Sequence, residues 1–313
     1  MTAALDIVLP MFGLMLCGYV SARLGVLRGE AVRGLSVFVF VFAIPALLFR
    51  GITGGSTSGG DQLTIVYAYF LGCLLIFGGS MLVGRKVFRL TLQEQAVMAF
   101  TTTFSNTVLL GIPLIYAAFG QAGILPVTLI TSLHSIILLT LATTIVEFAK
   151  GAGRHFLHTM PKTLLALLRN PLLLAIIAGY VVRFLGLPVP VVLERGTELL
   201  AGAAAPCSLF ALGATLTTFR IGGDAAQSVF LVVTKMLIHP LVVWLLASYV
   251  FTLVPLQIAV ATILAALPAG ANAFILAERY GVYLERAATC VLVTTALSVV
   301  TVALLLAHYA PAP

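Results

Sequence analysis

Residues Thr101–Gly120 read TTTFSNTVLLGIPLIYAAFG and place Asn106 and Pro113 in the middle of a stretch that is otherwise apolar enough to cross a membrane. Proline has no backbone N–H, and its ring clashes with the carbonyl group one turn earlier, so backbone polar groups are left free. In lipid these groups must be satisfied by other parts of the protein or by a water-filled cavity. The segment therefore predicts a membrane helix that is interrupted at a functional site.

The composition of the whole chain is that of an integral membrane protein. Hydrophobic residues make up 61% of the 313 residues and charged residues only 9%, whereas a soluble domain contains about 25% charged residues. A helix needs about 20 apolar residues to cross the hydrocarbon core, and ten segments meet this requirement. They are residues 4–22, 32–50, 63–84, 96–118, 123–147, 170–187, 198–219, 228–250, 257–279 and 286–308. We therefore expect an all-α polytopic membrane protein with ten transmembrane helices.

The basic residues are distributed unevenly over the connections between these spans. If the N-terminus faces outward, most of the 17 Lys and Arg residues fall in the cytoplasmic connections. Such a bias sets the orientation of a membrane protein, so both termini are expected outside the cell membrane. The net charge of +7 then indicates contact with phospholipids and no nucleic-acid partner. The four cysteines lie in apolar segments without the spacing of metal ligands, so no metal site and no cofactor are expected.

Shifting the sequence against itself by 161 residues aligns its two halves. Pro10 falls on Pro171, and GYV at residues 18–20 falls on GYV at residues 179–181. The same register matches LG at 24–25 with 185–186, PALLF at 45–49 with PCSLF at 206–210, and FG at 119–120 with YG at 280–281. Each half holds five spans, and an odd number requires that the second half enters the membrane inverted. Inverted repeats are an architecture of secondary transporters. We expect repeats at residues 1–150 and 170–313, joined by a cytoplasmic linker at 151–169.

The interruption in span 4 has a counterpart in span 9, which contains ALPAGANAFILAERYG at residues 266–281. The offset places Asn106 next to the counterpart of Pro268, and Pro113 close to the counterpart of Asn272. Free amides at the start of a half-helix can bind an anion, and free carbonyls can hold a cation or a proton donor. A single proline is also tolerated as a kink in a membrane helix, but the matched pair predicts a binding site where the two spans meet.

Two motifs carry a resemblance to a known family. SNTVLLGIPLIYAAFG (Ser105–Gly120) and AALPAGANAFILAERYGV (Ala265–Val282) resemble the paired signature of the auxin efflux carrier family, which includes the plant PIN carriers and bacterial transporters of small carboxylates. The resemblance implies a ten-helix fold like that of bile-acid and sodium/proton carriers, with the broken spans 4 and 9 crossing each other. Spans 1, 2, 6 and 7 would form a scaffold, often dimeric, and spans 3–5 and 8–10 a transport domain that moves as an elevator.

The resemblance also implies roles for individual residues. Asn106 matches the asparagine that contacts the substrate carboxylate, and His134 stands where plant carriers have a binding-site glutamine. The residues expected to contact the substrate are Ser105, Asn106, Thr107, His134, Asn272 and the aliphatic Ile44. The residues expected to form the crossing are Gly111, Pro113, Pro268 and Gly270. Leu48 replaces a pocket serine of the plant proteins, and their long hydrophilic loop is absent, which favours an anion other than indole-acetate.

Three titratable side chains, His134, Lys235 and His239, lie well inside predicted spans 5 and 8. His134 lies near the centre of span 5, where an ionisable residue indicates function by default; it would pair with a carboxylate, carry a proton, or donate a single hydrogen bond between helices. Lys235 would extend to the cytoplasmic interface, or it would neutralise helix ends and replace a coupling sodium ion at the crossing. His239, one turn later, is expected to be structural.

These features together predict a secondary transporter. The expected substrate is a small organic anion, either an auxin-like carboxylate or a dicarboxylate, moved by elevator-type alternating access as a uniporter or a proton-linked carrier. A sodium-coupled symporter of the same fold is the alternative, although no carboxylate lies at mid-depth in any span. An anion channel or an intramembrane enzyme belongs to another class. The chain has no HExxH, no GxSxG and no paired aspartates in its spans, so we expect no enzyme. A homodimer through the scaffold helices is expected.

Overall fold

The computed structural model describes residues 2–54, 62–151 and 170–309, and within these ranges the chain is helical without a β-strand. The first half contains α1 (Thr2–Arg23), α2 (Gly29–Phe38), η1 (Val39–Ala43), α3 (Ile44–Gly54), α4 (Thr64–Lys86), α5 (Leu92–Thr103), η2 (Thr107–Gly111), α6 (Ile112–Phe119), η3 (Gly120–Gly123) and α7 (Ile124–Ala149). The second half contains α9 (Pro171–Phe184), α10 (Val191–Leu216), α11 (Ala225–Val233), η4 (Thr234–Ile238), α12 (His239–Leu245), η5 (Leu246–Val250), α13 (Pro255–Ala266), α14 (Asn272–Tyr280) and α15 (Leu284–Tyr309).

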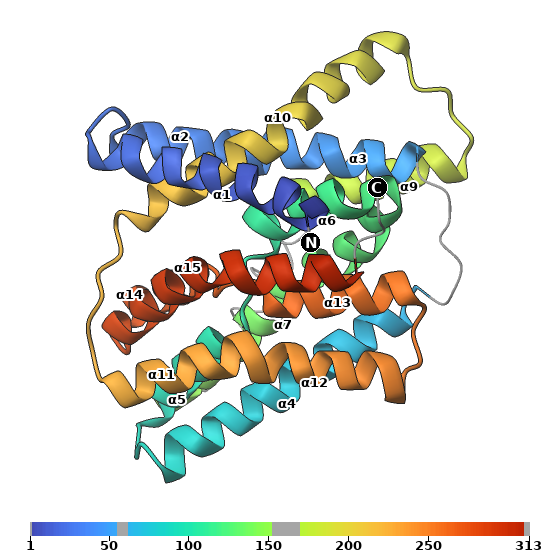
Figure 1. Cartoon of the computed structure of the whole chain (residues 1–313). Helices are drawn as coiled ribbons and strands as arrows, with labels where there is room; N and C mark the ends of the chain where they lie inside the picture. Colours follow the sequence, from blue (N-terminus) through green and yellow to red (C-terminus); the bar gives the residue numbers. More distant parts are fainter. Residues whose placement is uncertain (1, 55–61, 152–169, 310–313) are drawn as a thin grey trace.

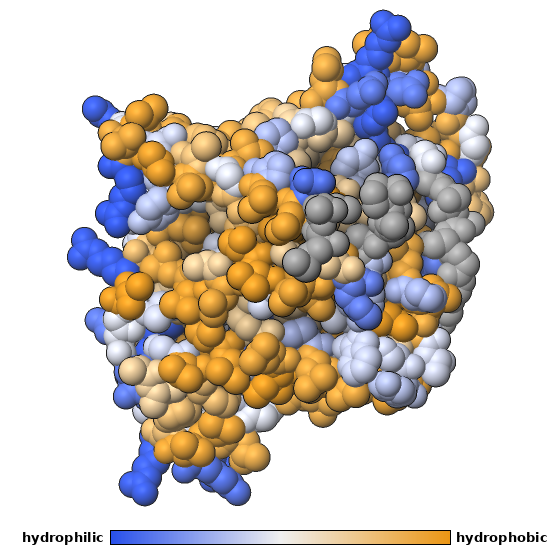
Figure 2. All heavy atoms as spheres, in the orientation of Figure 1, coloured by the Kyte–Doolittle hydropathy of each residue, from blue (hydrophilic) through white to orange (hydrophobic). Residues whose placement is uncertain are grey.

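Seven stretches of the described residues are long and apolar enough to cross a membrane. They are Ala4–Arg23, Gly29–Gly54, Thr64–Lys86, Thr107–Ala149, Val191–Leu216, Ala225–Val250 and Leu284–Tyr309, and α9 and α13 are shorter apolar helices. The predicted spans 96–118 and 257–279 are each divided into two helices. Figure 2 shows a surface that is largely hydrophobic (orange), with hydrophilic residues (blue) gathered towards its edges. Such a surface suits contact with lipid.

The helices lie in two groups (Figure 1). α1, α2, α3, α9 and α10 form one group, in which α1 packs on α10 and α3 packs on both α9 and α10. α4, α5 and α11–α15 form the other, in which α4 packs on α5 and α12 packs on α13. α7 contacts α5 in the second group and α3 in the first. The boundary between the two groups therefore runs past α7.

Glycines allow the helices of the first group to approach closely. A Cβ atom at Gly18 of α1 would collide with the carbonyl oxygen of Phe210 in α10, and one at Gly213 of α10 would collide with that of Met15 in α1. Gly179 of α9 lies against α3. Small residues are the usual means of close helix packing in membranes, because little apolar driving force exists between helices in lipid. The first group is thus held together by backbone-to-backbone packing.

Three of the four π turns in the described residues end two positions before a proline. They are η1 before Pro45, η2 before Pro113 and η4 before Pro240. Proline cannot donate to the carbonyl four residues earlier, and a π turn widens the helix at that point. Pro113 therefore lies inside a continuing helix. The chain is interrupted earlier in this span, between Thr103 and Thr107.

Candidate functional site

The two interrupted spans meet at their breaks. Ser105, between α5 and η2, forms an isolated antiparallel bridge with Ala269, between α13 and α14. The N–H of Asn106 donates to the carbonyl of Pro268 at 3.0 Å, and the N–H of Gly270 donates to the carbonyl of Phe104 at 2.9 Å. Each break thus satisfies backbone groups of the other, as backbone polar groups inside a membrane require. Residues 104–106 and 268–270 are called the crossing below.

Two predicted glycines permit this close approach. A Cβ atom at Gly270 would lie 2.8 Å from the ring of Phe104. At Gly111, a Cβ atom would lie 2.8 Å from Leu264 and 2.9 Å from Leu267. Contacts this short require a shift of the neighbours, because interiors are close-packed. Both glycines are therefore needed for the two spans to touch.

Lys235, in the π turn η4, is fully buried beside the crossing. Its Nζ donates to Oγ of Ser105 at 2.7 Å and to the carbonyl of Ala265 at 2.6 Å, and it lies 3.2 Å from Nδ1 of His239. Nε2 of His239 lies 3.4 Å from Sγ of Cys73 in α4. Of the two positions considered for Lys235 from the sequence, the structure has the one at the crossing. The ammonium group contacts both interrupted spans, at the end of α13 where a helix carries partial negative charge.

His134 holds the crossing from the α7 side. Its Nε2 accepts a hydrogen bond of 3.0 Å from the N–H of Ser105, and its ring packs 4.7 Å from the ring of Phe104. An accepting Nε2 carries no proton, so this hydrogen bond requires the neutral tautomer protonated at Nδ1. Nδ1 is buried and has no partner among the described residues. In the other half, Oγ1 of Thr294 accepts from the N–H of Ala269 at 3.0 Å. His134 and Thr294 thus each bind one of the two segments of the crossing by a hydrogen bond to its backbone.

The other predicted contact residues are arranged differently. Asn106 is 8% exposed, and its carboxamide makes no hydrogen bond with any residue that the structure describes. Thr107 begins η2 and is buried. Ile44, fully buried at the start of α3, and Asn272, half-buried at the start of α14, take no part in the hydrogen bonds described above. Asn106 is therefore the free polar side chain at the crossing.

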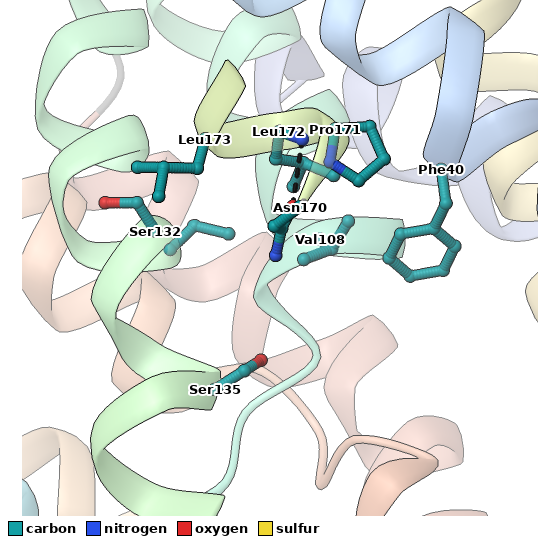
Figure 3. A pocket seen from close by; sticks show the side chains of 9 residues that line it. Phe40, Val108, Ser132, Ser135, Asn170, Pro171, Leu172 and Leu173 are labelled. Carbon is teal, nitrogen blue, oxygen red and sulfur yellow. Dashed lines mark hydrogen bonds between the residues drawn. The ribbon is translucent and has the colours of Figure 1, made fainter. Parts of the chain in front are cut away.

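A cavity of about 300 Å³ lies where η1 and the start of α9 meet η2 and α7 (Figure 3). Its lining residues come from η1, η2, α7 and the start of α9. They are Phe40, Val108, Thr131, Ser132, Ser135, Asn170, Pro171, Leu172 and Leu173. The polar residues among them were not predicted from the sequence. Hydroxyl residues flanking His134 and an Asn-Pro pair at the start of span 6 were the signals that could have found them.

An all-helical apolar chain in which two interrupted spans cross has the architecture of a membrane transporter. Residues 3–306 match the family described as "Membrane transport protein", and the chain belongs to this family, which is the auxin efflux carrier family that its motifs resemble. The chain is a multi-pass membrane transporter and not an enzyme.

Relatives that match this chain over nearly their whole length support its membership of the family. A protein of Rhizobium meliloti (strain 1021) named "Putative malonate transporter" is 31% identical over 296 residues, which are 95% of this chain and 92% of that protein. An uncharacterized transporter of Methanothermobacter thermautotrophicus is 25% identical over 96% of both chains. The uncharacterized transporter YfdV of Escherichia coli (strain K12) is 25% identical over 94% of both.

Proposed function

We propose that the chain is a secondary transporter that moves a small organic anion by elevator-type alternating access, as a uniporter or a proton-linked carrier. The observation that carries this proposal is the ammonium group of Lys235 at the crossing, bonded to Ser105 of one interrupted span and to the carbonyl of Ala265 of the other. When protonated, this lysine places a positive charge where the two interrupted spans meet, and that charge favours an anion there. The free carboxamide of Asn106 supplies donors for it at the same place.

Contacts between helices support two inverted five-helix repeats. A Cβ atom at Gly18 would collide with the carbonyl oxygen of Phe210, and a Cβ atom at Gly179 would lie 3.4 Å from that of Phe49. Gly179 lies 161 residues after Gly18, and Phe210 lies 161 residues after Phe49. The glycine of each half thus faces the equivalent phenylalanine carbonyl of the other half. A two-fold axis between the repeats produces such reciprocal pairs. We therefore propose repeats at 1–150 and 170–313; residues 152–169 of the expected linker lie outside the described residues.

The two groups of helices support the proposed division into scaffold and transport domain. The cavity is lined by Phe40 and the start of α9, from the proposed scaffold, and by Val108 and α7, from the proposed transport domain. In an elevator, sliding of the transport domain past the scaffold would carry such a cavity from one membrane face to the other. The exposed apolar side chains of the first half of α10, such as Val192 and Leu199, are consistent with a homodimer through the scaffold in the cell membrane. Both termini would lie outside.

A short dicarboxylate is the substrate we propose first. The relative from Rhizobium meliloti is named as a malonate transporter, and a small flexible dianion fits a cavity of about 300 Å³. An alternative of the same fold is a sodium-coupled symporter. An anion channel is an alternative of another class, which would show no saturation and no counterflow.

The test is a thermal-shift screen of the purified protein against short carboxylates, at two pH values and with or without sodium, followed by counterflow of labelled malonate in proteoliposomes. Malonate should stabilise the wild type, and Asn106→Ala should abolish the shift. Gln121→Ala, at an exposed position of η3, is the control and should respond as the wild type does. If no carboxylate stabilises the wild type or supports counterflow, the proposed function is rejected.

A further inference from the structure

The molecule contains a second cavity at the boundary between the two groups of helices. Its volume is about 520 Å³, and it lies between α1, the end of α10 and α15. Four of its lining positions correspond to lining positions of the first cavity at the offset of 161 residues. Leu9 corresponds to Asn170, Phe12 to Leu173, Leu292 to Thr131 and Ala296 to Ser135. Equivalent positions of the two halves therefore build two related cavities.

The two cavities differ in chemistry at three of these four positions. Where the second cavity has Leu9, Leu292 and Ala296, the first has an amide and two hydroxyl groups. Polar side chains inside a membrane protein cost free energy unless they find a partner. The second cavity shows that apolar side chains are sufficient for packing at these three positions. The polar side chains of the first cavity thus point to a ligand.

The orientation of Asn170 shows which kind of atom faces this cavity. Its Oδ1 accepts a hydrogen bond of 2.9 Å from the N–H of Leu172, so Asn170 caps the N-terminus of α9. The amide nitrogen must then lie on the opposite side, where Figure 3 shows it directed away from α9 and towards the side of the cavity where Ser135 lies. This nitrogen has no partner among the described residues. Two N–H donors and the positive end of a 14-residue helix therefore face the cavity.

Thr131, on the α7 side of the cavity, is a second and independent indication of a ligand. Its side chain lines the cavity from α7 and is 5% exposed, and its Oγ1 has no hydrogen-bond partner among the described residues. A threonine in a helix commonly bonds to the carbonyl one turn earlier, as Thr143 of the same helix does. An unpaired buried hydroxyl group is costly, and a ligand oxygen would satisfy it.

We propose that Asn170, Thr131 and Ser135 form a subsite that binds a carboxylate group of the transported anion. The proposal rests on the proposed function and extends it to the α9 side of the cavity. All three side chains supply N–H or O–H donors, and the described lining residues include no Asp or Glu, so the subsite favours a negatively charged acceptor. Val108, two residues after Asn106, also lines the cavity, so we assign one carboxylate of a dicarboxylate to Asn106 and the other to this subsite. The subsite therefore sets the preference for a dicarboxylate over a monoanion.

The decisive variant is Asn170→Asp. Aspartate caps a helix as well as asparagine does, so α9 is retained, but the N–H donors are replaced by a negative charge. The measurement is the Kd of malonate and of its half-amide malonamate by isothermal titration of the purified protein. We expect the Asn170→Asp variant to weaken malonate binding about tenfold or more and to lose the preference for malonate over malonamate.

Thr131→Val tests the same subsite and leaves the helix cap of α9 unchanged. If Asn170→Asp lowers the melting temperature of the free protein, Thr131→Val becomes the decisive variant. Ser135→Ala and Ala296→Ser are matched exchanges at equivalent positions; only the first should weaken malonate binding. If the wild type binds malonate, Asn106→Ala weakens it, and both Asn170→Asp and Thr131→Val bind as the wild type does, the subsite is rejected while the proposed function stands. Absence of carboxylate binding by the wild type rejects both.

Discussion

Nζ of Lys235 lies 2.7 Å from Oγ of Ser105, and this hydrogen bond joins η4 to the break between α5 and η2. The same nitrogen bonds to the carbonyl of Ala265 at 2.6 Å, in the last turn of α13. A fully buried charge requires close polar partners. Hydroxyl and carbonyl oxygens are the ligands that hard cations prefer. In the proposed function, the protonated lysine takes the place of a bound cation where the two interrupted spans meet.

Replacement of Lys235 by methionine should damage both stability and transport. Methionine has a similar volume, but it leaves Ser105 Oγ and the Ala265 carbonyl without their buried donor, which costs about 1–3 kcal/mol for each unsatisfied group. We expect a lower melting temperature in detergent and loss of malonate counterflow in proteoliposomes. Lys86→Met, at an exposed position near the end of α4, is the control. Unchanged melting and counterflow in Lys235→Met would show that the ammonium group is dispensable.

Transport by the wild type should not require sodium. The oxygens of Ser105 and Ala265 already contact the ammonium group of Lys235, and a second cation beside it would be repelled. We expect the rate of malonate uptake to remain the same when choline replaces sodium on both sides of the proteoliposome membrane. The sodium-coupled alternative would be supported if uptake became slower as sodium was removed. It would also be supported if an inward sodium gradient drove accumulation of malonate.

The positions of the crossing and of the cavity were predictable from the sequence to different degrees. The repeat offset places Asn106 next to the counterpart of Pro268, and the two are hydrogen-bonded in the structure. Pro113 was expected at a break, but the π turn η2 accommodates it within the helix. The break at residues 104–106 depends instead on pairing with residues distant in the sequence, which no local pattern encodes. Asn170 was missed for the same reason, since its role depends on how α9 lies against α7.

The histidine of α7 should make transport depend on pH. Nε2 of His134 accepts the N–H of Ser105 only while that nitrogen is unprotonated, so protonation of Nε2 would break this bond. The groups around the ring are Tyr69 and Phe70 of α4 and Phe104 of the crossing. Glutamine at position 134 retains an acceptor and does not titrate.

If transport is proton-linked through His134, we expect the rate of malonate transport by His134→Gln to change less with pH than the wild-type rate does. The difference should lie on the acidic side, because burial disfavours the charged imidazolium. Because malonate itself titrates at the acidic end, the comparison is made between the two proteins at each pH. His134→Ala, which lacks an acceptor for the Ser105 N–H, should also have a lower melting temperature. A pH profile of His134→Gln identical to that of the wild type would remove His134 from the coupling role.

The close approach at the crossing can be tested with a single methyl group. In Gly270→Ala, the added Cβ would lie 2.8 Å from the ring of Phe104, and overpacking of this kind costs about 1–3 kcal/mol. Because the N–H of Gly270 bonds to the carbonyl of Phe104, relief of the clash would also lengthen this bond, and transport should be impaired together with stability.

The matched control is Gly78→Ala in the middle of α4, where a Cβ would meet no heavy atom within 4 Å. Alanine is favoured over glycine inside a helix by about 1 kcal/mol, so this variant should melt at the same temperature as the wild type or higher. The two glycine-to-alanine changes are thus expected to shift the melting temperature in opposite directions. If Gly270→Ala melts and transports as the wild type does, the two spans do not require a glycine where they meet, and the crossing is looser than the distances to Phe104 indicate.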